Sequence, residues 1–336
     1  MSTRVAVIGA GSWGTTLANL LSKKGHDVVL WSFEKDVAEA IGSRHVNPVY
    51  LPDIQLSPTL RATSSLEDAV RDATVLVSVS PAQHVRKILA GIVDGLVPET
   101  LVVSASKGIE TSTLDTMAEV MDDILPGPVA KRASYLSGPS FALEVAQEHP
   151  TAVTVASRSH EAAVETQQLF QTDYFRVYTN PDVRGVELGG ALKNVIALAA
   201  GMADGLGFGH NTRAALITRG LAEIQRLGTA LGADPLTFAG LAGMGDLILT
   251  CTGGLSRNRQ VGIRLGKGEK LKDILADMKM VAEGVETSRA AHDLSLREGI
   301  EMPIVSEVYR VLFEDKPAID AVRSLMVREP RPEQWQ

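Results

Sequence analysis

Short runs of β-branched and other apolar residues alternate with helical stretches along the first half of the chain, from Arg4 to about Tyr178. These runs occupy 5–8 (VAVI), 28–31 (VVLW), 75–78 (VLVS), 101–104 (LVVS) and 151–155 (TAVTV). Continuous apolar strands are typical of sheets that helices cover on both faces. The pattern therefore predicts an α/β fold with a parallel, doubly wound sheet of the Rossmann type.

The pattern changes after Val183, where long Ala- and Leu-rich segments with 3.6-residue periodicity replace the β-branched runs. We therefore expect a Rossmann-type α/β domain over residues 1–183 and an all-α domain over residues 184–336. A chain of 336 residues has the length of two ordinary domains.

Charge and composition exclude several classes of partner. The net charge of −7 argues against nucleic acid, which needs a concentrated basic face. The single cysteine, Cys251, cannot form an internal disulfide, and no Cys or His pair has zinc-ligand spacing, so no metal is expected. The opening apolar run is too short for a secretory signal, and no membrane span is expected, the nearest apolar run being flanked by Lys193 and Asp204. These features predict a cytoplasmic protein.

A glycine motif follows the first predicted strand. It reads Gly9-Ala10-Gly11-Ser12-Trp13-Gly14 and opens the next helical pattern. Between a strand and a helix, such glycines give a tight turn, close approach of backbone to a pyrophosphate, and a helix N-terminus that favours anions. The motif predicts a dinucleotide site, the alternative being a merely tight turn.

Coenzyme choice depends on the end of the second strand, which reads Ser32-Phe33-Glu34-Lys35. An acid there would hold a ribose 2′-hydroxyl, so Glu34 favours NAD. Lys35 could instead meet the extra phosphate of NADP, and either residue could cap the following helix. The preference between NAD and NADP stays open at this point.

Lys193 is the one charged residue in the otherwise apolar helical stretch from Leu188 to Ala203. A buried ammonium needs a partner, a snorkelling route or a catalytic role, and we favour the last. Lys107 follows an apolar strand, at the sheet edge where such folds bind ligands, although a solvated loop lysine is an equal alternative.

Two further segments of the second half could contact a substrate. Ser256 precedes Arg257, Asn258 and a helical pattern, so it is a candidate N-cap in a phosphate site, or simply the cap of a surface helix. Asp246 follows a glycine-rich turn and could cap a helix or accept hydrogen bonds from substrate hydroxyls. Cys251 is expected to be a core residue, and His210 to end a loop.

The chain resembles the bacterial NAD(P)-dependent glycerol-3-phosphate dehydrogenase family along nearly its whole length. The resemblance is carried by the glycine motif and by segments 47–52 (NPVYLP), 106–110 (SKGIE), 136–142 (LSGPSFA), 190–194 (GALKN), 243–247 (GMGDL), 255–258 (LSRN) and 281–284 (VAEG). Several of these segments are long, and they occur in the family's order, so chance agreement is negligible.

The resemblance implies an oxidoreductase that transfers hydride reversibly between NAD(P)H and C2 of dihydroxyacetone phosphate, supplying sn-glycerol 3-phosphate for glycerophospholipid synthesis. It implies that Lys193 donates and accepts the proton and that Lys107 lies beside the substrate carbonyl and near the coenzyme. The substrate contacts that it implies are Lys107, Gly138, Ser140, Lys193, Asp246, Ser256, Arg257 and Asn258. The coenzyme contacts are Gly9, Gly11, Ser12, Trp13, Gly14, Lys107, Ala142, Arg257, Val281 and Glu283.

The family commonly has basic residues around Phe33 and Glu34, and this chain departs from it there, so the family's usual preference for NADPH is not carried over. Two other functions stay open: a dehydrogenase of similar plan that acts on a hydroxy acid or sugar acid, and a dinucleotide sensor without catalysis. The charged Lys193 argues against the sensor. Apolar helical faces are compatible with a homodimer, although the sequence does not show which face would be free.

Overall fold

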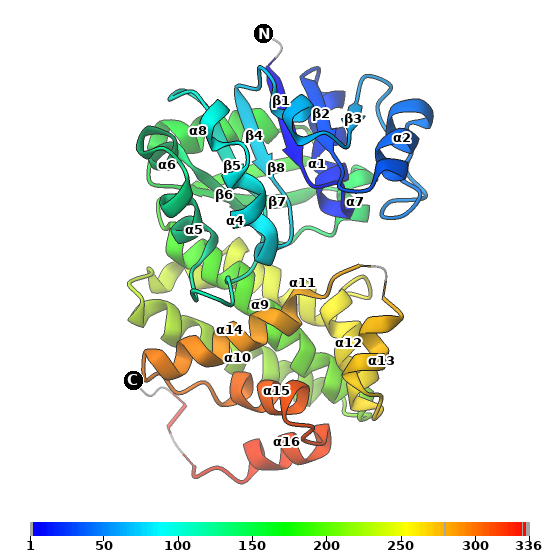
Figure 1. Ribbon diagram of the computed structural model, residues 1–336. Coiled ribbons are helices and arrows are strands. Elements are labelled where there is room, and N and C mark those ends of the chain that lie inside the picture. The colour runs from blue at the N-terminus through cyan, green and yellow to red at the C-terminus, as the bar shows by residue number, and fades with distance from the viewer. Residues whose placement is uncertain (1–2, 279, 331, 334–336) are drawn as a thin grey trace. The chain divides into compact units, whose positions relative to one another are not determined.

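The computed structural model describes residues 3–278, 280–330 and 332–333 (Figure 1). The chain folds into two compact units. The first contains Met1–Lys107 and Asp115–Val183, and the second contains Gly108–Leu114 and Arg184–Gln336. The short segment Gly108–Leu114 therefore packs with the helical part of the chain, and Ile109 is a fully buried member of that part's core.

The first unit is built on one sheet of eight strands in the order β3-β2-β1-β4-β5-β6-β7-β8. The strands are β1 (Arg4–Ile8), β2 (Asp27–Trp31), β3 (Arg61–Thr63), β4 (Val75–Ser78), β5 (Leu101–Ser104), β6 (Ser134–Ser137), β7 (Thr151–Ser157) and β8 (Phe175–Asn180). All five strands expected from apolar runs are present. The Rossmann-type fold is confirmed.

The expectation of an entirely parallel sheet was wrong at one junction. Strand β7 pairs antiparallel with β6, and β8 then runs parallel to β7, so the sheet is mixed. An apolar strand reads the same in either direction, so the run at residues 151–155 carried no signal of its orientation. The segment between β6 and β7 contains the short helix α7 (Ala142–Ala146).

The sequence did not indicate β3, β6 and β8, each for a physical reason. Strand β3 has three residues, and β6 reads Ser-Tyr-Leu-Ser, with polar residues at both ends. Strand β8 lies at the edge of the sheet and buries only Phe175 and Val177 of its residues. An edge strand with one covered face alternates, so it lacks the continuous apolar run of the central strands.

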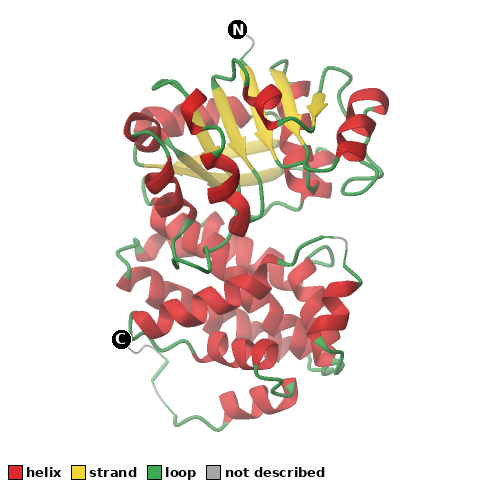
Figure 2. Ribbon diagram, viewed as in Figure 1, coloured by secondary structure: helices red, strands yellow, loops and turns green. Residues whose placement is uncertain are grey.

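Helices lie in two layers on this sheet, as Figure 2 shows. In one layer α1 contacts both α7 and α8, and in the other α4 contacts α5, which contacts α6. The helices of the unit are α1 (Ser12–Lys23), α2 (Lys35–Arg44), α3 (Leu66–Val70), α4 (Ala82–Ala90), α5 (Met117–Ile124), α6 (Gly127–Arg132), α7 and α8 (His160–Phe170).

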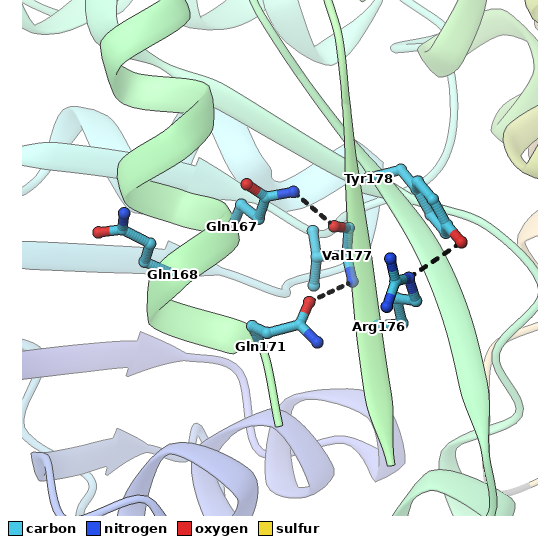
Figure 3. Close-up of a pocket in the computed structure, with 6 residues that line it drawn as sticks. All are labelled: Gln167, Gln168, Gln171, Arg176, Val177 and Tyr178. Atoms are coloured by element: carbon cyan, nitrogen blue, oxygen red, sulfur yellow. Dashed lines mark hydrogen bonds between the residues drawn. The ribbon is translucent and has the colours of Figure 1, made fainter. Parts of the chain in front are cut away.

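Two glutamines close the outer edge of the sheet (Figure 3). Gln167 of α8 donates its side-chain amide to the carbonyl of Val177 at 2.7 Å, and the side-chain carbonyl of Gln171 accepts from the Val177 N–H at 3.0 Å. On the same strand, Arg176 lies over the ring of Tyr178. Unpaired backbone groups on an edge strand can pair with another chain, and the two glutamines satisfy both backbone groups of Val177 instead. The shallow pocket that these side chains line therefore lies where α8 covers the edge strand β8.

In the second unit, every regular element of the described residues from 184 onward is helical (Figure 2). The helices are α9 (Val183–Gly205), α10 (His210–Ala230), α11 (Asp246–Thr252), α12 (Arg257–Gly266), α13 (Leu271–Ala276), α14 (Glu283–Arg297), α15 (Pro303–Phe313) and α16 (Ala318–Met326), with a π-helical turn at Leu241–Gly245. The expectation of an all-α second half is confirmed.

Helix α9 supplies the centre of the helical core. Among the described residues it is the one helix long and apolar enough to cross a membrane, but 94% of its apolar window is buried inside the fold. The apolar run recognised in the sequence lies between Lys193 and Asp204, so it is shorter than the helix. Burial of nearly the whole helix is what a core position predicts.

Glycines bring the backbones of α9 and α12 into direct contact. A Cβ at Gly262 would lie 2.2 Å from the carbonyl oxygen of Leu198 and 2.9 Å from Cα of Gly201. One turn further on, Gly205 and Gly266 face each other in the same way, with a built Cβ 3.0 Å from the opposite Cα. Small residues four apart on both helices permit this approach, which side chains would prevent.

We expect Gly262→Ala to lower the free energy of unfolding by about 3 kcal/mol, because the new methyl would overlap a backbone oxygen that cannot rotate away. The matched control is Gly42→Ala in α2, where a built Cβ meets no atom within 4 Å. That change should be neutral or stabilising by up to about 1 kcal/mol. Urea unfolding of both variants tests the contact, and equal effects would contradict it.

Glu223 of α10 is a buried carboxylate at the N-terminus of α15. Its two oxygens accept from the backbone N–H of Ile304 at 2.8 and 3.1 Å, and one also accepts from Val305 at 3.3 Å. Burial raises the pKa of Glu223 to about 7, although the two backbone N–H groups oppose the shift. The folded protein therefore retains a proton here that the unfolded chain releases near pH 4.5.

Stability should therefore fall as the pH rises from about 4.5 to about 7, by about 3 kcal/mol from this group. Glu223→Gln keeps an acceptor for the N–H groups and removes the titration, so its unfolding free energy should change less over this window. Glu286→Gln, at an exposed position of α14, is the control. Urea unfolding at a series of pH values measures the slope, and an identical slope in wild type and Glu223→Gln would refute the assignment.

Candidate functional site

The glycine motif forms the turn from β1 into α1, and each glycine has its own physical reason. Gly9 has φ +118°, which favours glycine, and its N–H donates to the carbonyl of Trp31 at 3.1 Å. Gly14 packs so closely that a Cβ would lie 1.8 Å from the carbonyl oxygen of Gly9. At Gly11, by contrast, no protein atom lies within 4 Å of a built Cβ. Chain packing thus explains Gly9 and Gly14 but not Gly11.

The N-terminus of α1 suits an anion. Its first turn contains no acidic residue, and Gly11 at the N-cap provides no side chain that would satisfy the first N–H groups. Ser12 donates its hydroxyl to the carbonyl of Tyr50 at 2.6 Å, and the Trp13 ring packs against Phe175. Ala142 begins α7, and its carbonyl accepts from Thr16 of α1 at 3.1 Å. Ser12, Trp13 and Ala142 therefore lie in or against α1, where a helix N-terminus without acidic residues fits the pyrophosphate of a dinucleotide.

The loops after β5 and β6 bring three further predicted residues together. Lys107 donates from Nζ to the carbonyl of Gly138 at 3.1 Å, and the Ser140 hydroxyl donates to the same oxygen at 3.0 Å. Gly138 has φ +136°, and a Cβ there would lie 2.9 Å from Cα of Val153. Because β5 and β6 are parallel neighbours, these loops lie at one carboxyl edge of the sheet, where such folds bind ligands.

In the second unit Lys193 is buried and ion-paired. Its Nζ lies 2.9 Å from Oδ1 of Asp246, and the two side chains are 8% and 2% exposed. Lys193 also donates to Oγ1 of Thr250 at 2.8 Å, and Thr250 donates to the backbone carbonyl of Asp246 at 2.6 Å. The partner that a buried ammonium requires is thus Asp246, held with Thr250 on one face of α11.

A π-helical turn delivers Asp246 to this position. The N–H of Gly245 donates to the carbonyl of Gly240 at 3.1 Å, and Asp246 then begins α11. A Cβ at Gly243 would lie 2.2 Å from the carbonyl oxygen of Phe238, so the turn requires glycine there. Such single π-turns are rare and occur often at functional sites. The glycine-rich sequence before Asp246 thus sets the direction of its side chain.

The N-terminus of α12 carries the next group of predicted residues. Ser256 is the N-cap, and its hydroxyl accepts from the Arg259 N–H at 3.2 Å, as expected. Arg257 donates to the carbonyl of Val281 at 2.9 Å, and Oδ1 of Asn258 accepts from the Gly284 N–H at 3.0 Å, in the first turn of α14.

This helix end is positively charged. Arg257 is exposed, and its hydrogen bond to a carbonyl leaves its charge unneutralised by that contact. Arg259 instead pairs with Asp204, with Nη2 2.7 Å from Oδ2. A capped helix N-terminus with a guanidinium can bind an anion such as a phosphate.

Gly284 connects this helix end to α9. A Cβ at Gly284 would lie 2.7 Å from Oδ1 of Asn258 and 2.8 Å from the carbonyl oxygen of Asn194, the residue after Lys193. Within the second unit, the structure therefore brings together Lys193, Asp246, Ser256, Arg257, Asn258, Val281 and Glu283, which begins α14.

Sequence reasoning missed Thr250, Asn47 and Tyr50 as residues that hold the site. Thr250 follows Asp246 by four residues, so helical spacing could have indicated a shared face. Cys251, by contrast, is fully buried in the helical core, and burial raises the pKa of its thiol to about 12. His210 is exposed and begins α10, as expected of a residue that ends a loop. Among the described residues, no group of three His, Cys, Asp or Glu side chains could hold a metal ion.

The glycine motif generates a matched pair of variants. Gly11→Ala should leave the melting temperature unchanged, because its methyl meets no protein atom, but should weaken dinucleotide binding by more than about tenfold because the methyl obstructs the pyrophosphate. Gly14→Ala should lower the melting temperature, because its methyl would overlap Gly9. Thermal melts and titration of NADH fluorescence test both, and unaltered NADH binding by Gly11→Ala would refute the site.

Two family models match most of the chain. The model for the NAD-dependent glycerol-3-phosphate dehydrogenase N-terminus matches residues 4–163, and the model for the C-terminus of the same family matches residues 182–323. The chain is 60% identical over 333 residues to a glycerol-3-phosphate dehydrogenase (NAD(P)+) of Geobacter metallireducens, with 99% of each chain covered. The corresponding protein of Geobacter sulfurreducens is 59% identical over 335 residues, and the alignment covers 100% of both chains.

Solved structures agree with these sequence matches. A crystal structure of glycerol-3-phosphate dehydrogenase from Coxiella burnetii is similar with a TM-score of 0.92 and 37% identity, covering 97% of this chain and 99% of the other. The yeast glycerol-3-phosphate dehydrogenase structure is similar with a TM-score of 0.80 and 30% identity, covering 96% and 99%. The arrangement of Lys193, Asp246 and the α12 N-terminus thus lies in a chain that belongs to the NAD-dependent glycerol-3-phosphate dehydrogenase family.

Proposed function

We propose that the protein is an NAD(P)-dependent oxidoreductase that interconverts dihydroxyacetone phosphate and sn-glycerol 3-phosphate. The observation that carries the proposal is the buried pair of Lys193 and Asp246, with Nζ and Oδ1 2.9 Å apart, in the same unit as the α12 N-terminus. A dinucleotide sensor has no need of an ammonium held in an apolar helix. The names of the relatives supply the substrate, and both NAD and NADP are coenzymes of that family.

The chain's own groups divide the work between binding and proton transfer. The bound coenzyme supplies the hydride that adds to C2 of the ketone. The backbone N–H groups at Gly11 and Ser12 bind its pyrophosphate, and Trp13, Ala142, Val281 and Glu283 contact the rest of it. Gly9 and Gly14 shape the turn that permits this approach.

Lys193 is the catalytic acid in the reducing direction. The Lys193 ammonium would donate a proton to the C2 carbonyl oxygen, which gains negative charge when the ketone is reduced. In the oxidising direction, the neutral Lys193 amine would accept the proton of the C2 hydroxyl, and the oxidised coenzyme would take the hydride from C2. Asp246 and Thr250 hold the ammonium in place. Asp246 would also accept a hydrogen bond from a substrate hydroxyl. Lys107 provides a second positive charge to the oxygen and also contacts the coenzyme.

The phosphate ester is bound by the positively charged end of α12. Ser256, Arg257 and Asn258 contact the phosphate or the adjacent hydroxyl, and Arg257 also contacts the coenzyme. Gly138, whose carbonyl accepts hydrogen bonds from both Lys107 and Ser140, and Ser140 itself complete the proposed substrate contacts. Charge-assisted hydrogen bonds from a guanidinium and a helix N-terminus favour a phosphate ester over a neutral triose.

The cellular role follows from the product. Glycerol 3-phosphate is the phosphate ester on which glycerophospholipids are built, and we propose that the enzyme supplies it in the cytoplasm.

A homodimer stays a prediction, supported by exposed apolar side chains on the helical unit, such as Leu236 and Met326. Analytical ultracentrifugation would test it.

The activity is tested by the loss of absorbance at the reduced-nicotinamide band, with dihydroxyacetone phosphate and either NADH or NADPH. Lys193→Met should lower kcat by at least about 100-fold, because general acid catalysis is lost, while NADH binding stays within about threefold. Lys272→Met, at an exposed position of α13, is the control and should retain wild-type turnover.

A buried Asp246 without its partner could weaken folding, so the double variant Lys193→Met with Asp246→Asn provides a second measurement. It removes both charges and should fold and bind NADH, yet remain inactive. Wild-type turnover in either variant would refute the role of Lys193. Absence of turnover by the wild-type protein with both coenzymes would refute the proposed reaction.

A further inference from the structure

The segment at residues 47–52, which the reaction does not use, is fixed to both sides of the glycine turn. Asn47 is fully buried, and its side-chain amide donates to the carbonyl of Ala10 at 2.9 Å and to Oγ1 of Thr15 at 2.8 Å. Its side-chain carbonyl accepts from the N–H of Tyr50 at 3.0 Å. The hydroxyl of Ser12 donates to the Tyr50 carbonyl. The backbone of Tyr50 is thus held by the pyrophosphate turn itself.

The Tyr50 side chain extends from this anchored backbone to the end of β2. Its hydroxyl donates to Oε1 of Glu34 at 2.7 Å, and the Ser32 hydroxyl donates to Oε2 at 3.2 Å. The hydrogen bond to Glu34, with burial, raises the pKa of Tyr50 to about 12, so the phenol stays a donor at neutral pH. Each carboxylate oxygen has two lone pairs, so both can still accept another hydrogen bond.

Lys35 occupies a different place. It begins α2, and its side chain lies with Glu39 of α2 and Thr63 of β3 in the lining of a hollow between these two elements. Neither Glu34 nor Tyr50 belongs to that lining. Lys35, the cation that would bind a 2′-phosphate, therefore lies among different residues from Tyr50 and Ser32, which hold the Glu34 carboxylate.

We propose that Tyr50 is a specificity-determining residue, which holds the Glu34 carboxylate to accept hydrogen bonds from the adenosine ribose hydroxyls, so that this protein selects NAD(H) over NADP(H). An acid at the end of β2 is placed to bind a ribose 2′-hydroxyl. A 2′-phosphate would bring about −1.5 to −2 charge against a carboxylate that the chain holds in place. The inference rests on the proposed function only for the binding of a dinucleotide.

The test is direct binding of NADH and NADPH, measured by coenzyme fluorescence and calorimetry, with the kcat/KM ratio as a second readout. The wild-type protein should bind NADH at least about 30-fold more tightly than NADPH. Tyr50→Phe removes only the hydroxyl and should narrow this ratio about three- to tenfold, mainly by weakening NADH binding. Glu34→Gln removes the charge, keeps an acceptor for Tyr50 and should narrow the ratio further by strengthening NADPH binding.

Two controls separate selection from general damage. Tyr178→Phe makes the same change on the edge strand β8, and Lys35→Ala removes the alternative cation; both should leave the ratio as in the wild type. An unchanged ratio in Tyr50→Phe or Glu34→Gln would overturn the inference, as would a wild-type preference for NADPH. Loss of NADPH binding in Lys35→Ala, with NADH binding intact, would also overturn it and assign the selection to Lys35.

The same measurements distinguish this inference from the proposed reaction. NADH preference that depends on Tyr50, without turnover of dihydroxyacetone phosphate, would support the inference and refute the reaction. Turnover with equal use of both coenzymes would refute the inference and support the reaction.

Discussion

The contact of α9 with α12 through glycine on both sides is the constraint on which the helical unit depends. Backbone meets backbone there, with a Cβ built at Gly262 only 2.2 Å from the carbonyl oxygen of Leu198. The distance between the two helices is therefore set by main-chain atoms, which have no rotamers to change. This fixed pair places the α12 N-terminus near the turn of α9 that carries Lys193, and Gly284 of α14 fits between Asn258 and Asn194.

Most of the architecture could be predicted from the sequence because the central strands are covered on both faces. That environment leaves continuous apolar runs, such as residues 75–78, and their alternation with helices indicates the fold class. Strand direction could not be predicted, because an apolar run carries no polarity, and β7 proved antiparallel to β6. The edge strand β8 was missed because one of its faces is open, so its buried residues alternate with exposed ones.

The candidate site was predictable to the extent that it depends on residues whose local context is unusual. A lysine in an apolar helical stretch can be recognised from the sequence, and Ser256 before Arg257 has the pattern of an N-cap. The partner of Lys193 was not predictable, because Asp246 is 53 positions further along the chain and only packing brings it within 2.9 Å. The contact of Tyr50 with Glu34 likewise depends on a buried asparagine, Asn47, whose hydrogen bonds no sequence pattern shows.

The burial of Cys251 has a consequence for the redox behaviour of the whole chain. It is the chain's only cysteine, and at a thiol pKa of about 12 almost none of it is thiolate, the form that reacts with oxidants and alkylating reagents. The folded protein therefore presents no accessible thiolate that peroxide could oxidise or glutathione could modify. A cysteine introduced on the surface would accordingly be the single position that a maleimide dye labels, without prior removal of a native thiol.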